Sequence, residues 1–154
     1  MNYNYIQIVQ VEDLKVLVKK QITIGGQTDT KTGDTFLTDP SGQSFFCIPK
    51  QLFMLDKSKL KGMTSLSEMY FKAQTGRHTI SVTPTMINTS KSQLTQLYDK
   101  DNDVTLWINS KFLGYFKGIK GVEYGYFKYR DAYMVCAYDM PKVLGVTVTH
   151  KPKI

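Results

Sequence analysis

Aromatic and basic side chains gather between Trp107 and Tyr138. The aromatic residues are Trp107, Phe112, Tyr115, Phe116, Tyr124, Tyr126, Phe127, Tyr129, Tyr133 and Tyr138. The basic residues are Lys111, Lys117, Lys120, Lys128 and Arg130, and Glu123 is the only acidic residue between the first and the last of them. Aromatic faces can stack on bases, and positive charges beside them can hold phosphates. The segment therefore predicts a nucleic-acid interface.

The predicted binding residues are Trp107, Lys111, Tyr115, Lys117, Lys120, Tyr124, Tyr126, Lys128 and Arg130. Alternation along a strand puts Tyr124, Tyr126 and Lys128 on one face. Because tyrosine carries a polar hydroxyl on an apolar ring, the two tyrosines beside this lysine form the predicted stacking platform. The competing interpretation is that these side chains belong to the core. It is strongest for Leu106, Ile108 and Phe127, and it extends to Trp107.

The overall charge favours an anionic partner. The chain of 154 residues has 20 Lys and Arg against 13 Asp and Glu, a net charge of +7, although an excess of lysine also serves solubility. Only Arg77 and Arg130 are arginines, and arginine is the residue that makes bidentate contacts to guanine edges. We therefore expect binding to single-stranded nucleic acid with low sequence specificity, and to DNA rather than RNA.

Motifs for catalysis or metal binding are weak in this sequence. Asp99, Asp101 and Asp103 resemble the start of a calcium loop, but its sixth position is Val104 and its twelfth is Ser110, where glycine and glutamate are needed. The histidines and cysteines are too scattered for a zinc site, and no phosphate-binding glycine loop occurs. We predict no catalytic residue, no metal and no cofactor, and thus a protein that is not an enzyme.

The elements expected in the first half are mostly strands. Alternation predicts strands at Tyr3–Val11 and Leu14–Ile24. The turn Asp39-Pro40-Ser41-Gly42 predicts a hairpin between Phe36 and Ile48. A helix is expected at Leu66–Thr75, where Ser65 and Glu68 have capping-box spacing and Gly76 follows.

In the second half, a strand is predicted at Arg77–Thr83 and a short helix at Lys91–Tyr98. The strands predicted after this helix are Val104–Ile108, Lys111–Lys117, Val122–Lys128, Tyr133–Tyr138 and Val143–His150. If Asn109-Ser110 is a two-residue hairpin turn, Trp107 pairs with Phe112. Both faces of that hairpin are apolar. Either both faces are buried, or one covers the core and the other meets a ligand or partner.

This pattern predicts a mainly β, α+β fold, either a small OB-like barrel or a strongly bent antiparallel sheet with one or two short helices. The likeness to OB-fold proteins is one of architecture and composition. A single domain spanning residues 1–154 is expected, with a short basic tail from about residue 149.

The start of the chain has no basic segment followed by an apolar signal run, and no apolar run of membrane-spanning length occurs. We therefore expect a cytoplasmic protein without a membrane partner. Cys47 and Cys136 lie in apolar runs, which favours reduced thiols.

A second functional hypothesis belongs to a different class. Aromatic residues are also enriched at protein interfaces, so the chain could be a structural or assembly protein of a phage or mobile element such as a plasmid. The aromatic hairpin would then be a subunit interface in a homo-oligomer. Oligomeric state and nucleic acid carried through purification distinguish the two hypotheses.

Overall fold

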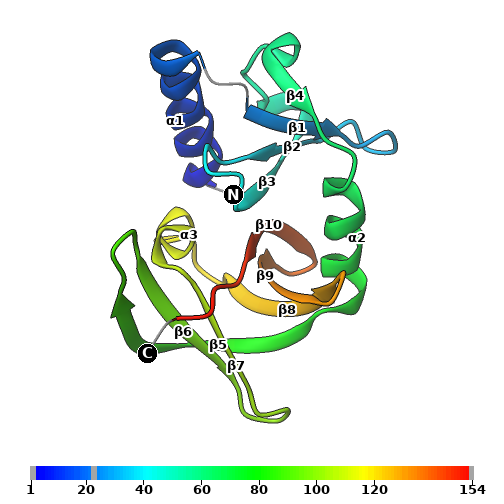
Figure 1. The fold of residues 1–154 in the computed structure, drawn as a ribbon. Coiled ribbons are helices and arrows are strands. Elements are labelled where there is room, and N and C mark those ends of the chain that lie inside the picture. The colour runs from blue at the N-terminus through cyan, green and yellow to red at the C-terminus, as the bar shows by residue number, and fades with distance from the viewer. Residues whose placement is uncertain (1–2, 22–23, 153–154) are drawn as a thin grey trace.

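The structure is a computed structural model that describes residues 3–21 and 24–152. Figure 1 shows a strongly bent sheet with helices against its faces. The helices are α1 (Asn4–Lys20), α2 (Leu66–Gly76) and α3 (Ser110–Tyr115), with short 3-10 helices η1 (Lys50–Leu52) and η2 (Lys57–Lys59). The strands are β1 (Ile24–Thr28), β2 (Thr35–Thr38), β3 (Ser44–Ile48), β4 (Leu60–Gly62), β5 (His78–Asn88), β6 (Gln93–Asp99), β7 (Val104–Asn109), β8 (Glu123–Tyr129), β9 (Ala132–Asp139) and β10 (Lys142–Val148).

All ten strands belong to one open sheet in the order β4-β1-β2-β3-β10-β9-β8-β5-β6-β7. Neighbouring strands are antiparallel except for the parallel pair β1 and β4. The half from β10 to β7 curls, so that β7 returns to the chain beyond β10 (Figure 1). There the backbone N–H of His150 donates to the carbonyl of Trp107 at 2.8 Å. The predicted mainly β, α+β class is confirmed, and the part of the chain that the structure describes has three α-helices where one or two were expected.

The two faces of the sheet bury two apolar clusters. One cluster holds Tyr5 of α1, Phe46 of β3 and Phe116, whose rings pack within 5.0–6.2 Å of one another. The other lies on the α2 side and includes Phe45 and Cys136. All five residues of β3 are buried, as expected for a strand covered on both faces. Within the described ranges no helix is long and apolar enough to cross a bilayer.

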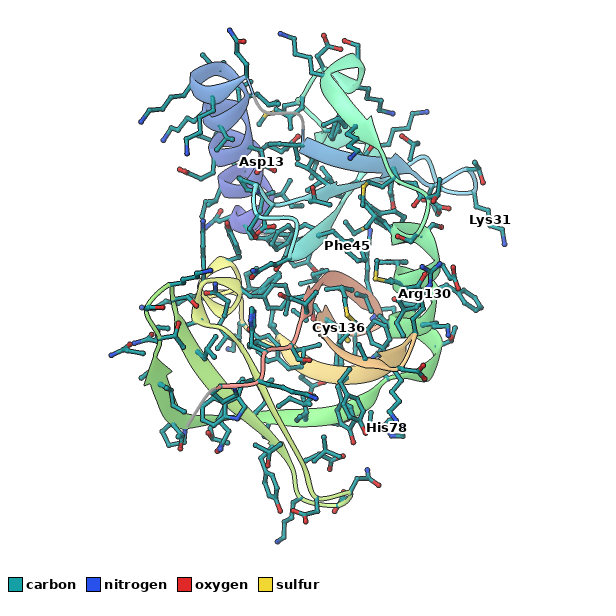
Figure 2. The ribbon with its side chains drawn as sticks, viewed as in Figure 1. Asp13, Lys31, Phe45, His78, Arg130 and Cys136 are labelled. Carbon is teal, nitrogen blue, oxygen red and sulfur yellow. The ribbon has the colours of Figure 1, made fainter. Side chains whose placement is uncertain are left out.

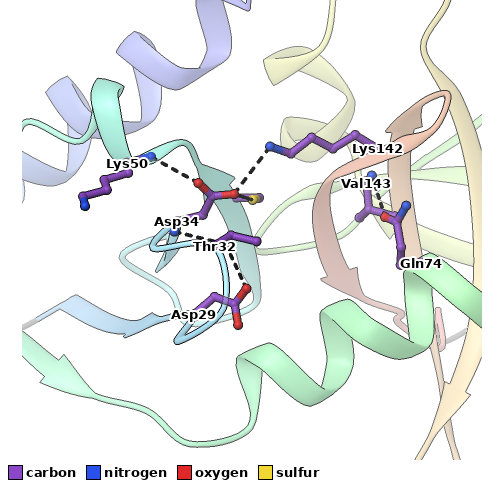
Figure 3. Close-up of polar contacts among 8 residues, drawn as sticks. Asp29, Thr32, Asp34, Lys50, Gln74, Lys142 and Val143 are labelled. Atoms are coloured by element: carbon purple, nitrogen blue, oxygen red, sulfur yellow. Dashed lines mark hydrogen bonds and ion pairs between the residues drawn. The ribbon is translucent and has the colours of Figure 1, made fainter.

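Polar contacts fix the loops around the middle of the sheet (Figure 3). Asp34 accepts a hydrogen bond from the backbone N–H of Lys50 at 3.2 Å and pairs with the Lys142 ammonium at 3.6 Å. Gln74 of α2 accepts from the backbone N–H of Val143 at 3.0 Å. The β1–β2 loop and helix α2 therefore both contact β10, a strand in the middle of the sheet.

The N-terminal strand prediction is wrong, because residues 4–20 form α1. Its buried residues Tyr5, Ile6, Val9 and Asp13 follow helical spacing. Short apolar runs fit both periods, and the β-branched residues favoured the strand. The second predicted strand, Leu14–Ile24, lies partly in α1 and starts β1 only at its last residue, while residues 22–23 lie outside the described ranges.

Two further elements were predicted in the wrong state. Residues 93–99 form strand β6 and not the short helix expected at 91–98. Residues 110–115 form helix α3 and not a strand, since the Asn109 side chain caps it by accepting from the backbone N–H of Lys111 at 3.0 Å. The predicted Asn109-Ser110 hairpin is therefore wrong, and Trp107 pairs with Gln96.

The remaining elements follow the predictions closely. Helix α2, the β2–β3 hairpin and strands β7 to β10 lie where they were expected. Strand β5 is longer than predicted, because it continues through Pro84 with a register shift between Val82 and Met86. Ser65 precedes α2 but makes no side-chain capping hydrogen bond there. Cys47 and Cys136 are buried free thiols. Burial raises the pKa of Cys47 to about 11 and that of Cys136 to about 12. Neither thiol therefore has the lowered pKa that activates a cysteine nucleophile.

Candidate nucleic-acid interface

A hollow of about 660 Å³ lies between the outer edge of β7, the β8–β9 turn and the segment after β10. Its lining residues are Thr105, Leu106, Trp107, Lys128, Asp131, Ala132, Tyr133, Thr149, His150, Lys151 and Pro152. The hollow lies here because β7 is the last strand of the sheet and, among the described residues, meets the returning chain through an isolated bridge at His150. A volume of this size falls in the range of about 300–1,000 Å³ that ligand sites occupy.

Two more hollows adjoin the first one. A hollow of about 400 Å³ shares Lys128 and Tyr133 with it and continues to His78 and Asn102. A hollow of about 600 Å³ shares the 150–152 segment and continues along the β5–β6 turn, residues 87–92. We call the three together the edge groove. Figure 2 places His78 at the lower side of the molecule, the same side as β5 and β7.

Two half-buried aromatic side chains face the edge groove. Trp107 and His150 are backbone bridge partners, and side chains of directly opposed residues lie side by side on one face of a sheet. Tyr133 stands opposite Lys128 in the β8–β9 pairing, and the Lys128 ammonium lies 5.1 Å from the centre of its ring. An exposed cation–π contact is worth only about 0.5–1 kcal/mol, so a base worth about 1–3 kcal/mol can displace it.

The β8–β9 turn sets the position of Tyr133 and Lys128. Arg130 and Asp131 have φ of 49° and 66°, the left-handed pair that a two-residue hairpin turn of type I′ requires. The turn therefore fixes the strand register by which Lys128 faces Tyr133.

Positive charge lies along the edge groove. Lys91, Lys128 and Lys151 are exposed along it, and Asp131 is the acidic residue among the lining side chains. Within the described residues, the buried Nε2 of His150 has no hydrogen-bond partner.

The stacking platform predicted on Tyr124 and Tyr126 loses Tyr126, which is buried. Tyr126 is 3% exposed, and its hydroxyl donates to the Asp99 carboxylate at 2.5 Å. Burial, then this contact, raises the pKa of Tyr126 to about 12, and the hydrogen bond from Tyr126 lowers the pKa of Asp99. Tyr124 is half-buried against the core, and burial raises its pKa to about 12 as well. Tyr126 reaches the edge groove as part of its wall.

The other predicted residues lie outside the edge groove. Tyr115 is buried in α3, with its ring edge against Phe46 at 4.9 Å. Lys111, Lys117 and Lys120 are exposed in and after α3. Arg130 lies on the α2 side of the sheet (Figure 2), over the ring of Tyr129 at 5.2 Å. Of the predicted binding residues, Trp107 and Lys128 line the edge groove with side chains that are not buried.

Sequence reasoning missed several lining residues, namely Lys91, Tyr133, His150 and Lys151 as binding residues. The pairing of Tyr133 with Lys128 could have been found, because the turn between them is short. The contact of His150 with Trp107 joins residues far apart in the chain, and no local pattern predicts it.

The aromatic hairpin was also predicted to form a subunit interface. Phe112 and Phe116 are 2% and 3% exposed in the core, so their side chains cannot contact another subunit. In the described ranges, no group of three or more His, Cys, Asp or Glu is placed to hold a metal ion.

No protein-family model matches the chain. The comparisons with curated proteins and with solved structures likewise give no match.

Proposed function

We propose that the protein binds single-stranded nucleic acid, DNA rather than RNA, in the edge groove and with little sequence preference. Trp107 and Tyr133 stack on bases, while Lys91, Lys128 and Lys151 contact phosphates. The observation that carries this proposal is the hollow beside β7, in which two half-buried aromatic rings lie beside exposed lysines and which shares lining residues with two neighbouring hollows. The OB-like reading of the curled half belongs to the same proposal, because such barrels bind nucleic-acid strands across their concave strands.

The depth of the aromatic rings supports a single strand. Trp107 and Tyr133 are half-buried, so only bases splayed out of a strand can reach their faces, whereas duplex bases are already stacked on each other. Lysines supply the positive charge along the groove, and a lysine ammonium is a point charge that holds a phosphate without reading a base. Low sequence preference follows.

Fluorescence anisotropy of labelled oligonucleotides tests the proposal. Single-stranded and double-stranded DNA and RNA are titrated with the full chain at two salt concentrations. We expect single-stranded DNA to bind most tightly, with the logarithm of affinity falling by about 0.7 per phosphate contact for each tenfold rise in salt. Absence of binding to any of the four at low salt would contradict the proposal.

Matched lysine variants locate the site. We expect Lys128→Gln with Lys151→Gln to lower the salt slope by about 1.4, the value for two lost phosphate contacts. Lys117→Gln with Lys120→Gln removes the same charge from exposed positions outside the groove, and should leave the slope nearly unchanged. Equal losses in both double variants would mean that binding follows net charge and not the groove.

A further inference from the structure

The hollow that contains His78, here called the His78 hollow, is enclosed by two separate parts of the fold. One wall is the sheet face of β5, β8 and β9, where His78 pairs with Tyr126 and Lys128 pairs with Tyr133. The rings of His78 and Tyr133 lie 5.3 and 5.7 Å from the ring of Tyr126. The other wall is the β6–β7 turn, which contributes Asn102. A space of about 400 Å³ therefore lies between aromatic rings and the side chain of a turn residue.

Hydrogen bonds orient the Asn102 side chain in the His78 hollow. Its Nδ2 amino group donates to the Asp99 carboxylate at 2.8 Å, and the same carboxylate accepts from the Tyr126 hydroxyl at 2.5 Å. The hydrogen bonds from Tyr126 and Asn102 lower the pKa of Asp99, so this carboxylate is ionised at neutral pH and can only accept. The amide of Asn102 must therefore present its nitrogen to Asp99.

This orientation decides which group Asn102 offers to a ligand. The amino group of a carboxamide donates hydrogen bonds, and the carbonyl oxygen accepts them. Because Asp99 holds the amino group, the Oδ1 atom is the group that Asn102 offers to the His78 hollow. The Asn102 side chain is exposed, so a ligand can reach this acceptor.

An acceptor in this place distinguishes between bases. Cytosine and adenine carry an exocyclic amino group that donates, whereas thymine carries the O4 acceptor at the corresponding position. A thymine or uracil oxygen would face Asn102 Oδ1 with no hydrogen between them. Lys128 also lines the His78 hollow, but as a flexible point charge it holds phosphate and does not read a base.

We propose that the His78 hollow binds one base of the strand, and that Asn102 accepts a hydrogen bond there from the exocyclic amino group of cytosine or adenine, so that thymine and uracil are disfavoured. The inference rests on the proposed function and adds one selective position to it. Trp107 lies in the neighbouring hollow, where stacking accepts any base. Oligothymidylate therefore still binds, but more weakly.

Anisotropy titrations with oligodeoxycytidylate and oligodeoxyuridylate of equal length test the inference. The two bases have the same ring size and differ at the group that meets Asn102, and a homopolymer places the same base in the hollow in every register. We expect the full chain to bind the cytidine strand about three- to tenfold more tightly, the change that one hydrogen bond produces. The hydrogen bond joins uncharged groups, so this ratio should be equal at two salt concentrations while both affinities fall.

Asn102→Ala removes the acceptor and should bring the ratio of the two affinities close to one, mainly by weakening the binding of the cytidine strand. The control, Asn4→Ala, removes an exposed asparagine from α1, outside the edge groove, and should keep the wild-type ratio. Circular dichroism checks that both variants are folded. If Asn102→Ala does not fold, the two strands compared on the wild-type chain still decide the matter.

Equal wild-type affinities for the two strands would overturn the inference and leave the proposed function standing. A preference for cytidine that survives Asn102→Ala, or a loss of the same factor with both strands, would show that Asn102 does not read the base. Absence of binding to either strand would overturn the proposed function, and this inference with it.

Discussion

Asp13 occupies the inner side of α1, where a carboxylate is costly. It is 1% exposed, and within the described residues its Oδ2 has no hydrogen-bond partner. Burial, reinforced by the charge of Asp39 and partly offset by Lys111, raises its pKa from 3.8 to about 8. The carboxyl group is therefore protonated in the folded protein at neutral pH, whereas in the unfolded chain it is ionised.

This raised pKa predicts a stability that depends on pH. Between about pH 4 and pH 8 the folded state holds a proton that the unfolded state has lost, so stability falls as pH rises through this window. We expect Asp13→Asn to flatten the decline and to gain at least about 1.4 kcal/mol at the upper end, the equivalent of one pKa unit. Urea unfolding at several pH values measures it.

The control for Asp13 is its neighbour Glu12, which is exposed and pairs with Lys15. Glu12→Gln should follow the wild-type pH profile. Parallel profiles for wild type and Asp13→Asn would show that Asp13 is not the titrating group.

The junction of β5 with β8 holds the curled half of the sheet together, and Gly125 makes this approach possible. A Cβ atom at Gly125 would lie 2.9 Å from the carbonyl oxygen of His78 on β5, and backbone cannot move aside as a flexible side chain can. We expect Gly125→Ala to lower the free energy of unfolding by about 1–3 kcal/mol, as overpacking does. Thermal or chemical unfolding measures this loss.

Gly114 gives the matched control in helix α3. A Cβ there meets nothing within 4 Å, and alanine is favoured over glycine within a helix by about 0.5–1 kcal/mol. Gly114→Ala should therefore be neutral or stabilising. If both alanine variants lose the same stability, close strand approach is not the cause.

The elements that sequence reasoning predicted correctly are those with local signals. The turn at Asp39-Pro40 fixed the β2–β3 hairpin, and Gly76 ends α2 as expected. Helix α3 was missed because aromatic residues at 112, 115 and 116 favour strands, while the decisive feature was the capping side chain of Asn109. In α1, apolar residues on both sides of the helix hid its period.

The candidate site was predictable only in part for a related reason. Composition identified Trp107 and Lys128. It could not separate Tyr126 from Tyr133, because burial of the first depends on Asp99, which belongs to a strand that had been taken for a helix. The remaining lining residues come from the end of the chain and from the β5–β6 turn, and only the curl of the sheet brings them to β7.

At the scale of the whole molecule, two surfaces lie at opposite ends. Helix α1 lies at one end of the molecule, and β5 and β7 lie at the other (Figure 1). Several apolar side chains of α1 are exposed, and β7 lines the edge groove. The net charge of +7 would add to the attraction of a nucleic-acid strand to the edge groove.

Trp107 is the single tryptophan of the chain and lies in the edge groove, so its fluorescence reports on this site alone. The most direct test is a titration of the protein with single-stranded oligothymidylate while this fluorescence is recorded. We predict saturable quenching with the same affinity and salt dependence as the anisotropy titration, because a base stacks on the indole. Binding by anisotropy without any change in tryptophan emission would contradict the edge groove as the binding site.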